Sequence, residues 1–152
     1  MIELALYQPD IAPNAATIIR MCACFGLTVT IIEPAGFAWT DSSFRRAGLD
    51  YLDRATVRRS PSWQAFHAAN SSRRLVLLST KAKTPYTNFS FSPDDTILVG
   101  QESSGAPPEV HQSVAARVLI PMLPNERSLN VSLACAMVTG EALRQVGGFP
   151  AL

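Results

Sequence analysis

Short apolar runs alternate along this chain with amphipathic segments, and glycine, proline or polar residues separate them. Compact apolar runs bounded in this way indicate buried strands, whereas apolar positions three and four residues apart indicate helices. Strands are therefore predicted at residues 2–7, 27–32, 55–58, 75–79, 96–100 and 118–120. Helices are predicted at residues 14–25, 41–46, 60–70, 107–112 and 128–146.

The alternation of strands and helices predicts an α/β fold, with a mainly parallel sheet flanked by helices. The 152 residues are enough for one domain with a sizeable core, and no linker or repeat divides them, so residues 1–152 are expected to form a single domain. Ligands of such sheets bind beyond the carboxyl ends of the strands. The loops that follow Ser79, Gly100 and Ile120 are therefore expected to meet at one rim.

Four of the predicted helices begin at a residue that can cap a helix N-terminus, namely Asn14, Asp41, Ser60 and Ser128. Asn130 then falls within the first turn of the last helix. Apolar residues at positions 131 and 133–138 cover nearly every side of that helix. A surface helix would show a polar face, so this helix is expected to be buried all round, inside the domain or at a subunit interface.

Composition adds a charge asymmetry to this picture. Residues 20–83 contain ten Lys and Arg and four Asp and Glu, a local charge of +6. Residues 84–152 contain three Lys and Arg and six Asp and Glu, a local charge of −3. The whole chain carries a net charge of +1. Eleven of the 13 cations are arginine, whose planar guanidinium suits phosphate. A nucleic-acid face is one interpretation, and ordinary solvated charge, which charge alone favours, is the other.

Several kinds of site are not indicated. The three cysteines form no CxxC pair and the two histidines lack ligand spacing, so neither a disulfide framework nor a metal site is predicted. Neither a dinucleotide-binding GxGxxG nor a P-loop occurs. No apolar run is long enough to cross a membrane, and the first residues lack a basic leader. A cytoplasmic protein without a membrane partner is expected.

Polar residues at the predicted rim are the candidates for chemistry. Gly100 and Gly105 enclose four polar residues after a buried strand, a loop that either wraps a small ligand or is a simple turn. Within it, Glu102 can accept a hydrogen bond from a substrate hydroxyl. Arg20 is either a surface cation or a ligand for phosphate or carboxylate. Asn130, a weak helix former, should have a partner in another loop or in a substrate.

These residues lie in segments that resemble the short, single-domain SPOUT RNA ribose 2′-O-methyltransferases, in particular those that act on the tRNA wobble cytidine or uridine. The resemblance covers essentially the whole chain. It is carried by Leu6-Tyr7-Gln8-Pro9, Pro13-Asn14, Ile18-Ile19-Arg20, Ile31-Ile32-Glu33-Pro34, Gly36-Phe37-Ala38-Trp39, Arg45-Arg46-Ala47-Gly48-Leu49-Asp50-Tyr51, Gly100-Gln101-Glu102-Ser103-Ser104-Gly105, Ile120-Pro121-Met122 and Arg127-Ser128-Leu129-Asn130-Val131-Ser132.

The resemblance implies a fold with a C-terminal trefoil knot, a homodimer formed by the first and last helices, and transfer of a methyl group from S-adenosyl-L-methionine, leaving S-adenosyl-L-homocysteine, to a ribose 2′-OH in the tRNA anticodon stem-loop. No metal is implied. Carried over by position, the cofactor-binding residues are Leu78, Gly100, Ile120, Met122, Ser128 and Leu129. Those around the reacting ribose are Asn14, Arg20, Glu102, Ser128 and Asn130, and those that contact RNA are Arg45, Arg46 and Lys81.

The chain also departs from the family pattern, which leaves two alternatives open. Ala15, Ala16 and Thr17 replace the usual residues after Asn14, and Gly140 stands where a tyrosine is usual. These departures motivate a non-catalytic RNA-binding factor on the same scaffold. The other alternative is a 2′-O-methyltransferase with another RNA target, such as rRNA. Such enzymes usually carry an added RNA-binding domain, for which 152 residues leave no room.

Overall fold

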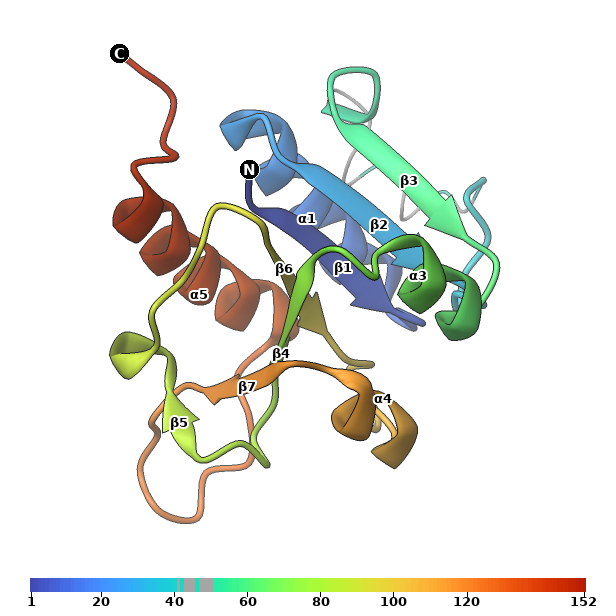
Figure 1. The fold of residues 1–152 in the computed structure, drawn as a ribbon. Helices are drawn as coiled ribbons and strands as arrows, with labels where there is room; N and C mark the ends of the chain where they lie inside the picture. The colour runs from blue at the N-terminus through green and yellow to red at the C-terminus, as the bar shows by residue number, and fades with distance from the viewer. Residues whose placement is uncertain (41, 43–45, 47–50) are drawn as a thin grey trace.

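The computed structural model describes residues 1–40, 42, 46 and 51–152 of the chain. Strands and helices alternate along most of these residues (Figure 1). The strands are β1 (Glu3–Tyr7), β2 (Thr28–Ile32), β3 (Thr56–Ser60), β4 (Arg74–Leu78), β5 (Thr84–Pro85), β6 (Asp95–Val99) and β7 (Ala116–Leu119). The helices are α1 (Ala12–Phe25), α3 (Trp63–Ala69), the short 3-10 helix η1 (Tyr86–Asn88), α4 (Pro108–Ser113) and α5 (Val131–Val146).

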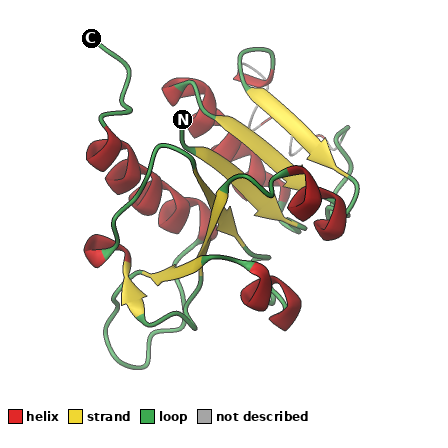
Figure 2. Ribbon diagram, in the orientation of Figure 1, coloured by secondary structure: helices red, strands yellow, loops and turns green. Residues whose placement is uncertain are grey.

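All strands belong to one seven-stranded sheet in the order β3-β2-β1-β6-β4-β7-β5. Every neighbouring pair is parallel, so the sheet is more regular than the mainly parallel one predicted. Helices lie on both sides of it (Figure 2). The α/β prediction is confirmed. The sequence did not predict β5 or η1, and the helix predicted at residues 41–46 falls mostly outside the described residues.

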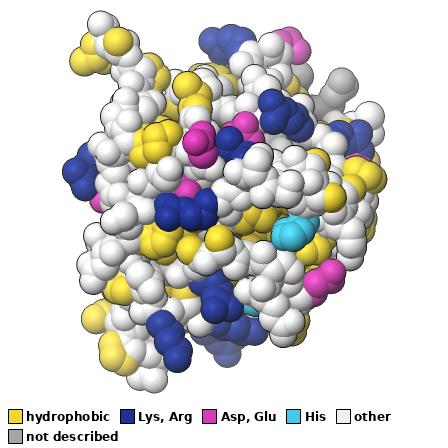
Figure 3. All heavy atoms as spheres, viewed as in Figure 1, with side chains coloured by type: hydrophobic (Ala, Val, Ile, Leu, Met, Phe, Trp, Pro, Cys, Tyr) yellow, Lys and Arg dark blue, Asp and Glu magenta, His cyan; other side chains and the backbone are white. Residues whose placement is uncertain are grey.

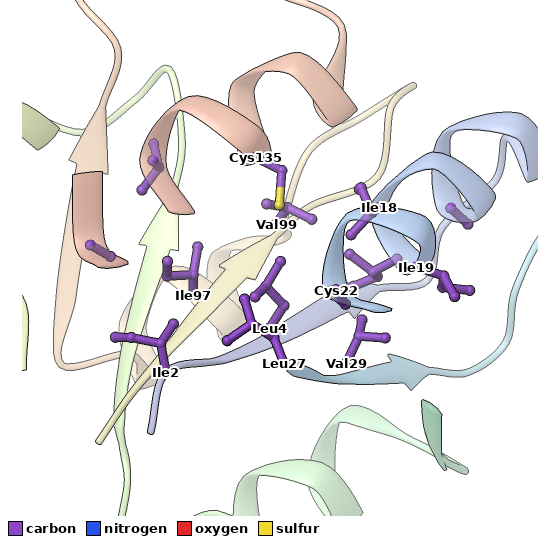
Figure 4. Packing of buried hydrophobic residues seen from close by; sticks show 14 of the residues in the cluster. Ile2, Leu4, Ile18, Ile19, Cys22, Leu27, Val29, Ile97, Val99 and Cys135 are labelled. Carbon is purple, nitrogen blue, oxygen red and sulfur yellow. The ribbon is translucent and has the colours of Figure 1, made fainter. Parts of the chain in front are cut away.

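The strands alternate their side chains between two hydrophobic layers. On one face, side chains of β1 and β6, such as Leu4 and Ile97, pack with those of α1 and α5 in a single cluster (Figure 4). On the other face, Ala5 and Leu98 pack with Trp63 and residues of α4. This alternation is the period of two that a strand imposes on its side chains. Both faces of the central strands are therefore covered by helices, as parallel sheets require.

The predicted helix starts are wrong by a few residues at three places. The N-cap of α1 is Ile11, so Asn14 lies in the first turn, where its side-chain amide faces Glu102. The N-cap of α3 is Ser62, because β3 extends through Ser60. The N-cap of α5 is Asn130 rather than Ser128, and its side-chain oxygen accepts from the first turn. Ser62 and Asn130 accept from amides in the first turns of their own helices, whereas Ile11 makes no side-chain cap.

One expectation about α5 is only half met. Cys135, Val138, Ala142 and Leu143 are fully buried, but Leu133 is 60% exposed, and other apolar side chains beside it are exposed as well. Within this chain the helix is therefore buried on one side only. The remaining apolar side fits the second half of the expectation, a subunit interface. The C-terminal trefoil knot stays a prediction.

Asp95 gives the sheet a testable electrostatic anchor. Its carboxylate is fully buried and accepts hydrogen bonds from Arg74 Nε at 2.6 Å and Nη2 at 2.7 Å, and from the Ser92 amide at 2.8 Å. The interaction raises the pKa of Arg74. Asp95→Ala should lower the free energy of unfolding by about 3 kcal/mol, because it leaves these donors without their acceptor.

Chemical denaturation of Asp95→Ala beside Asp94→Ala would check this. Asp94 pairs with the N-terminus, and its side chain is 77% exposed. Its loss should therefore change stability by no more than about 0.5 kcal/mol. Equal stability of the two variants would contradict the assignment of Asp95 as an anchor.

Candidate active site

A cavity of about 330 Å³ lies at the carboxyl ends of β4, β6 and β7. This volume is at the lower end of the range typical of small-molecule sites. Three loops form it, at residues 78–81, 99–106 and 120–129, together with the first turn of α5. These loops are the ones that the sequence predicted to meet, and the sheet order places their strands side by side. The predicted rim is therefore confirmed as a cavity.

The loop at residues 100–105 closes tightly on itself. Gln101 and Gly105 exchange backbone hydrogen bonds of 3.1 Å and 2.9 Å. Gly105 has a φ of +68°, a conformation that suits glycine. A Cβ on Gly100 would lie 2.5 Å from the Gly105 carbonyl carbon and 2.6 Å from the Ala106 nitrogen. Glycine at position 100 therefore allows the loop to fold over the end of β6.

A chain of side-chain amides connects α5 to this loop. The Asn130 Oδ1 atom accepts from the Ser132 amide at 2.9 Å, which fixes its Nδ2 as the donor toward Asn14 Oδ1 at 3.0 Å. The Asn14 Nδ2 atom must then face Glu102, and it lies 3.4 Å from Oε1. The helix cap thus sets the direction of both amides. Predicted residues from three segments meet here.

Asp10 contacts the other carboxylate oxygen of Glu102. Its backbone amide donates to Glu102 Oε2 at 3.0 Å, and the Glu102 amide donates to Asp10 Oδ1 at 3.2 Å. Burial, and then the hydrogen bond with Asp10, raise the pKa of Glu102 above its ordinary value. The hydrogen bond with the Glu102 side chain lowers the pKa of Asp10. Glu102 is therefore the carboxyl of this pair that takes up a proton first.

The structure brings most of the predicted site residues together. The cavity is lined by all six predicted cofactor-binding residues and by two others that were predicted: Leu78, Gly100, Ile120, Met122, Ser128 and Leu129, with Glu102 and Lys81. Asn14 and Asn130 lie next to it through their contact with Glu102.

Three predicted residues are not placed in this group. Arg20 is exposed, and its guanidinium lies over the Tyr51 ring, 4.6 Å from the ring centroid. It does not line the cavity. Arg46 is exposed, and Arg45 lies outside the described residues. The helical spacing between Asn14 and Arg20 did not bring both to one point, because six residues advance the helix by about 9 Å.

Sequence reasoning missed Asp10, His111 and Arg127. Asp10 follows the carboxyl end of β1, so the rule that selected the other loops applies to it as well. His111, interpreted from sequence as an ordinary residue, lines the cavity. Burial lowers its pKa, and the charges of Lys81 and Arg117 lower it further. Arg127 stands next to a predicted residue and adds a basic side chain to the lining, beside Lys81 and His111.

The positive charge of the first half of the chain is partly neutralised within the fold. Arg58 and Arg73 pair with Glu3, Arg59 pairs with Glu33, and Arg74 pairs with Asp95. In the view of Figure 3, Lys and Arg side chains lie in separate groups among hydrophobic and acidic ones. On that face they do not form one continuous patch. This favours the interpretation that much of the charge asymmetry is ordinary surface charge.

Two further findings concern the described part of the chain. No helix there is long and apolar enough to cross a membrane. No three His, Cys, Asp or Glu side chains are grouped there in a way that could hold a metal ion.

The parallel sheet and its cavity define an α/β protein with a small-molecule site at the carboxyl edge of the strands. Comparison with known families is consistent with this description. The model of the SpoU rRNA Methylase family matches residues 1–140, and the chain belongs to this family.

Individual relatives cover nearly the whole chain. A protein from Beijerinckia indica subsp. indica, named tRNA (cytidine(34)-2′-O)-methyltransferase, is 60% identical over 95% of this chain and 91% of its own. A solved structure described as giving structural insights into the 2-OH methylation of C/U34 on tRNA has a TM-score of 0.92 and 35% identity, covering 97% of both chains.

A more distant structure supports the fold alone. An AdoMet-bound rRNA methyltransferase from Sinorhizobium meliloti has a TM-score of 0.86 at 21% identity. The match covers 94% of this chain and 56% of that one.

Asn130 caps α5 through its side-chain oxygen and donates to Asn14 through its side-chain nitrogen, and two substitutions can separate these roles. Asn130→Ser keeps a side-chain oxygen for the first turn of α5 but removes the donor to Asn14. Asn130→Ala removes both, and should lower the free energy of unfolding by about 1 kcal/mol more than the serine variant does. Thermal denaturation of the two variants, compared at equal concentration, checks this. Equal midpoints would show that the cap contributes nothing to stability.

Proposed function

We propose that this protein transfers a methyl group from S-adenosyl-L-methionine to the ribose 2′-OH of the wobble cytidine or uridine in the tRNA anticodon loop. The observation that carries the proposal is the Glu102 carboxylate, which Asn14 and Asp10 hold at the edge of a small-molecule cavity. Family membership and the names of the close relatives support the reaction and the substrate. Because tRNA is the proposed substrate, the proposed location is the cytoplasm.

The cavity fits the chemistry of this methyl donor. Leu78, Ile120, Met122 and Leu129 supply apolar contacts for an adenine ring and a methionine side chain. The loop at residues 100–105 supplies backbone groups that approach closely because Gly100 has no side chain. The product, S-adenosyl-L-homocysteine, would be held by the same groups. When bound, S-adenosyl-L-methionine supplies a methyl group on a positively charged sulfur.

The residues of the chain contribute positioning and proton acceptance. A ribose hydroxyl is a poor nucleophile until its proton moves, so an acceptor within hydrogen-bond reach is required. Glu102 supplies this acceptor, and its raised pKa makes it a stronger base than an exposed glutamate. Ser128 lines the cavity, and Asn130 and Asn14 border it. These three side chains are proposed to orient the ribose, which accounts for much of the rate enhancement.

Cations near the cavity are proposed to hold RNA phosphates. Lys81 and Arg127 line the cavity, and both are exposed, so they can reach a phosphate beside the reacting ribose. Arg45 and Arg46 are proposed as more distant phosphate contacts. Arg20 is proposed as a phosphate ligand, because its planar guanidinium suits phosphate. Its place over Tyr51 implies that it acts from outside the cofactor cavity.

A homodimer through α1 and α5 is the proposed assembly. Leu133 is 60% exposed and Met137 is 43% exposed, one turn apart on α5. Ile11, before α1, and Leu129, before α5, are also exposed. Exposed apolar side chains on α5 and at the starts of both helices are typical of a protein interface. In such a dimer Arg20, on α1, would lie near the interface and could serve a site on the partner.

The experiment that tests the function is methyl transfer from labelled S-adenosyl-L-methionine to bulk bacterial tRNA, followed by nucleoside mass spectrometry. A 2′-O-methylated cytidine or uridine mapped to the wobble position is the expected product. Methylation of rRNA instead would favour the alternative of a 2′-O-methyltransferase with another RNA target. Tight binding of both ligands with no transfer to any RNA would favour a non-catalytic RNA-binding factor.

Arg20→Ala is expected to reduce methyl transfer by about 100-fold or more while the affinity for S-adenosyl-L-methionine stays within about threefold. The reason is that the guanidinium lies outside the cavity, so only the RNA loses a contact. Arg20→Lys, which keeps the charge without the planar fork, should recover part of the rate. Single-turnover rates measure the loss of methyl transfer, and calorimetric titration measures the affinity for the cofactor. Parallel loss of transfer and cofactor binding would contradict the role.

Leu133→Glu is expected to convert the dimer to a monomer, because it places a charge in the centre of the proposed apolar interface. Light scattering coupled to size-exclusion chromatography measures the mass directly. Glu126→Lys is the control, since Glu126 is exposed in the loop that precedes α5. A wild-type chain of monomer mass would contradict the assembly before any variant is made.

A further inference from the structure

Asp10 is the residue that does most to fix the position of Glu102. Each residue donates its backbone amide to the carboxylate of the other, at 3.0 Å and 3.2 Å. The Ser103 hydroxyl donates to the second oxygen of Asp10. The two residues are 92 positions apart in sequence, on loops that follow the neighbouring strands β1 and β6. The reciprocal pair therefore joins two strand ends at the edge of the cavity.

This arrangement leaves little freedom to the Glu102 carboxylate. One oxygen, Oε2, is held by the Asp10 amide, and the other, Oε1, faces the Asn14 amide. The Glu102 backbone is held as well, through its own amide to Asp10 Oδ1. Asn14 contributes one contact of 3.4 Å, so most of the restraint comes from Asp10. A carboxylate restrained in this way keeps its lone pairs in one direction.

Gly36 fits this role of Asp10. Its amide donates to the Pro9 carbonyl at 2.8 Å, so the segment after β2 packs directly against the turn that contains Asp10. A Cβ at position 36 would lie 2.8 Å from Asp10 Cα and 2.9 Å from Asp10 Cβ. Any larger residue would therefore displace Asp10 from its position. Glycine at this point permits the close approach that the reciprocal pair needs.

We propose that Asp10 is a positioning residue for methyl transfer, which acts by holding the Glu102 carboxylate in the orientation that accepts the ribose proton. The proposal rests on the proposed function for its chemistry. In the transfer step the ribose oxygen forms a bond to the methyl carbon, the carbon–sulfur bond breaks with its electron pair on sulfur, and the 2′ proton passes to Glu102. Asp10 is not among the residues that line the cavity, so its loss should differ in its effects from the loss of a cavity residue.

The first test is Asp10→Asn and Asp10→Ala in the full-length protein, measured as single-turnover rates with both ligands saturating. Asp10→Ala keeps the backbone amide of residue 10 but removes the carboxylate that accepts from the Glu102 amide and the Ser103 hydroxyl, so the loop that carries Glu102 is no longer held in place and the rate should fall by about 100-fold. Asp10→Asn keeps the shape and loses the charge, and should lower it by about 10-fold. The dissociation constants of S-adenosyl-L-methionine and of the tRNA should stay within about threefold for both. Asp94→Asn, an exposed carboxylate far from the cavity lining, is the matched control and should keep the wild-type rate.

The second test is Gly36→Ala, which removes no polar group. If the alignment of Asp10 matters, the added methyl should lower the single-turnover rate by about 10-fold or more without altering the affinity for the cofactor. Circular dichroism and the thermal midpoint establish that the variant is folded. A folded Gly36→Ala variant and an Asp10→Asn variant that both react at the wild-type rate would overturn the proposal.

A third measurement separates this proposal from the proposed function. The Glu102 carboxyl carbon, labelled with carbon-13 and assigned with Glu102→Gln, should titrate at lower pH in Asp10→Asn than in the wild type, because the partner that helps to raise its pKa is gone. The acid limb of the pH–rate profile should move the same way. The other titratable or charged groups facing this cavity are Lys81, His111 and Arg127, none of which the substitution changes. An unchanged titration of Glu102 would overturn the positioning role, even if the wild type methylated no tRNA. A shifted titration without any methyl transfer would contradict only the proposed function.

Discussion

Parallel pairing of every strand is the constraint on which the rest of this structure depends. Because all neighbours run in the same direction, all carboxyl ends lie at one edge, and every loop that leaves them starts from that edge. β1 lies between β2 and β6, so its outgoing turn separates the segment after β2 from the loop after β6. Asp10 and Glu102 meet for this reason, although they are 92 residues apart.

One side chain at the N-terminus of α5, Asn130, contributes both to the stability of the helix and to the geometry of the candidate active site. Asn130 caps the helix with its oxygen and uses its nitrogen to orient Asn14, which in turn faces Glu102. A cap is usually a local device that satisfies a free backbone amide. Here it also decides which end of each amide points at the carboxylate. The same group thus stabilises the helix on the core and sets the polarity of the candidate active site.

How much the sequence could predict differs between strands and helix starts. Residues 96–100 were predicted as a buried strand, and β6 is buried throughout, because its apolar pattern is a local property that the sheet preserves. Asn14 and Ser128 were predicted as caps, but the N-caps are Ile11 and Asn130. Arg20 was grouped with the cavity residues, but it lies over Tyr51. Asn14 instead contacts Glu102 and Asn130, which are 88 and 116 residues away, and a local pattern does not contain such contacts.

The sequence by itself determined the α/β class, most element positions and the rim where the cavity lies, because these follow from periodicity and from the direction of the strands. The six residues that the family resemblance gave as cofactor-binding line that cavity. Only the tertiary structure decided that Asp10 pairs with Glu102, that Asn130 rather than Ser128 caps α5, and that α5 keeps an exposed apolar side. The physical reason is that hydrogen bonds and packing are short-range in space, and the order of strands in the sheet, not the order of residues in the chain, determines which side chains come within that range.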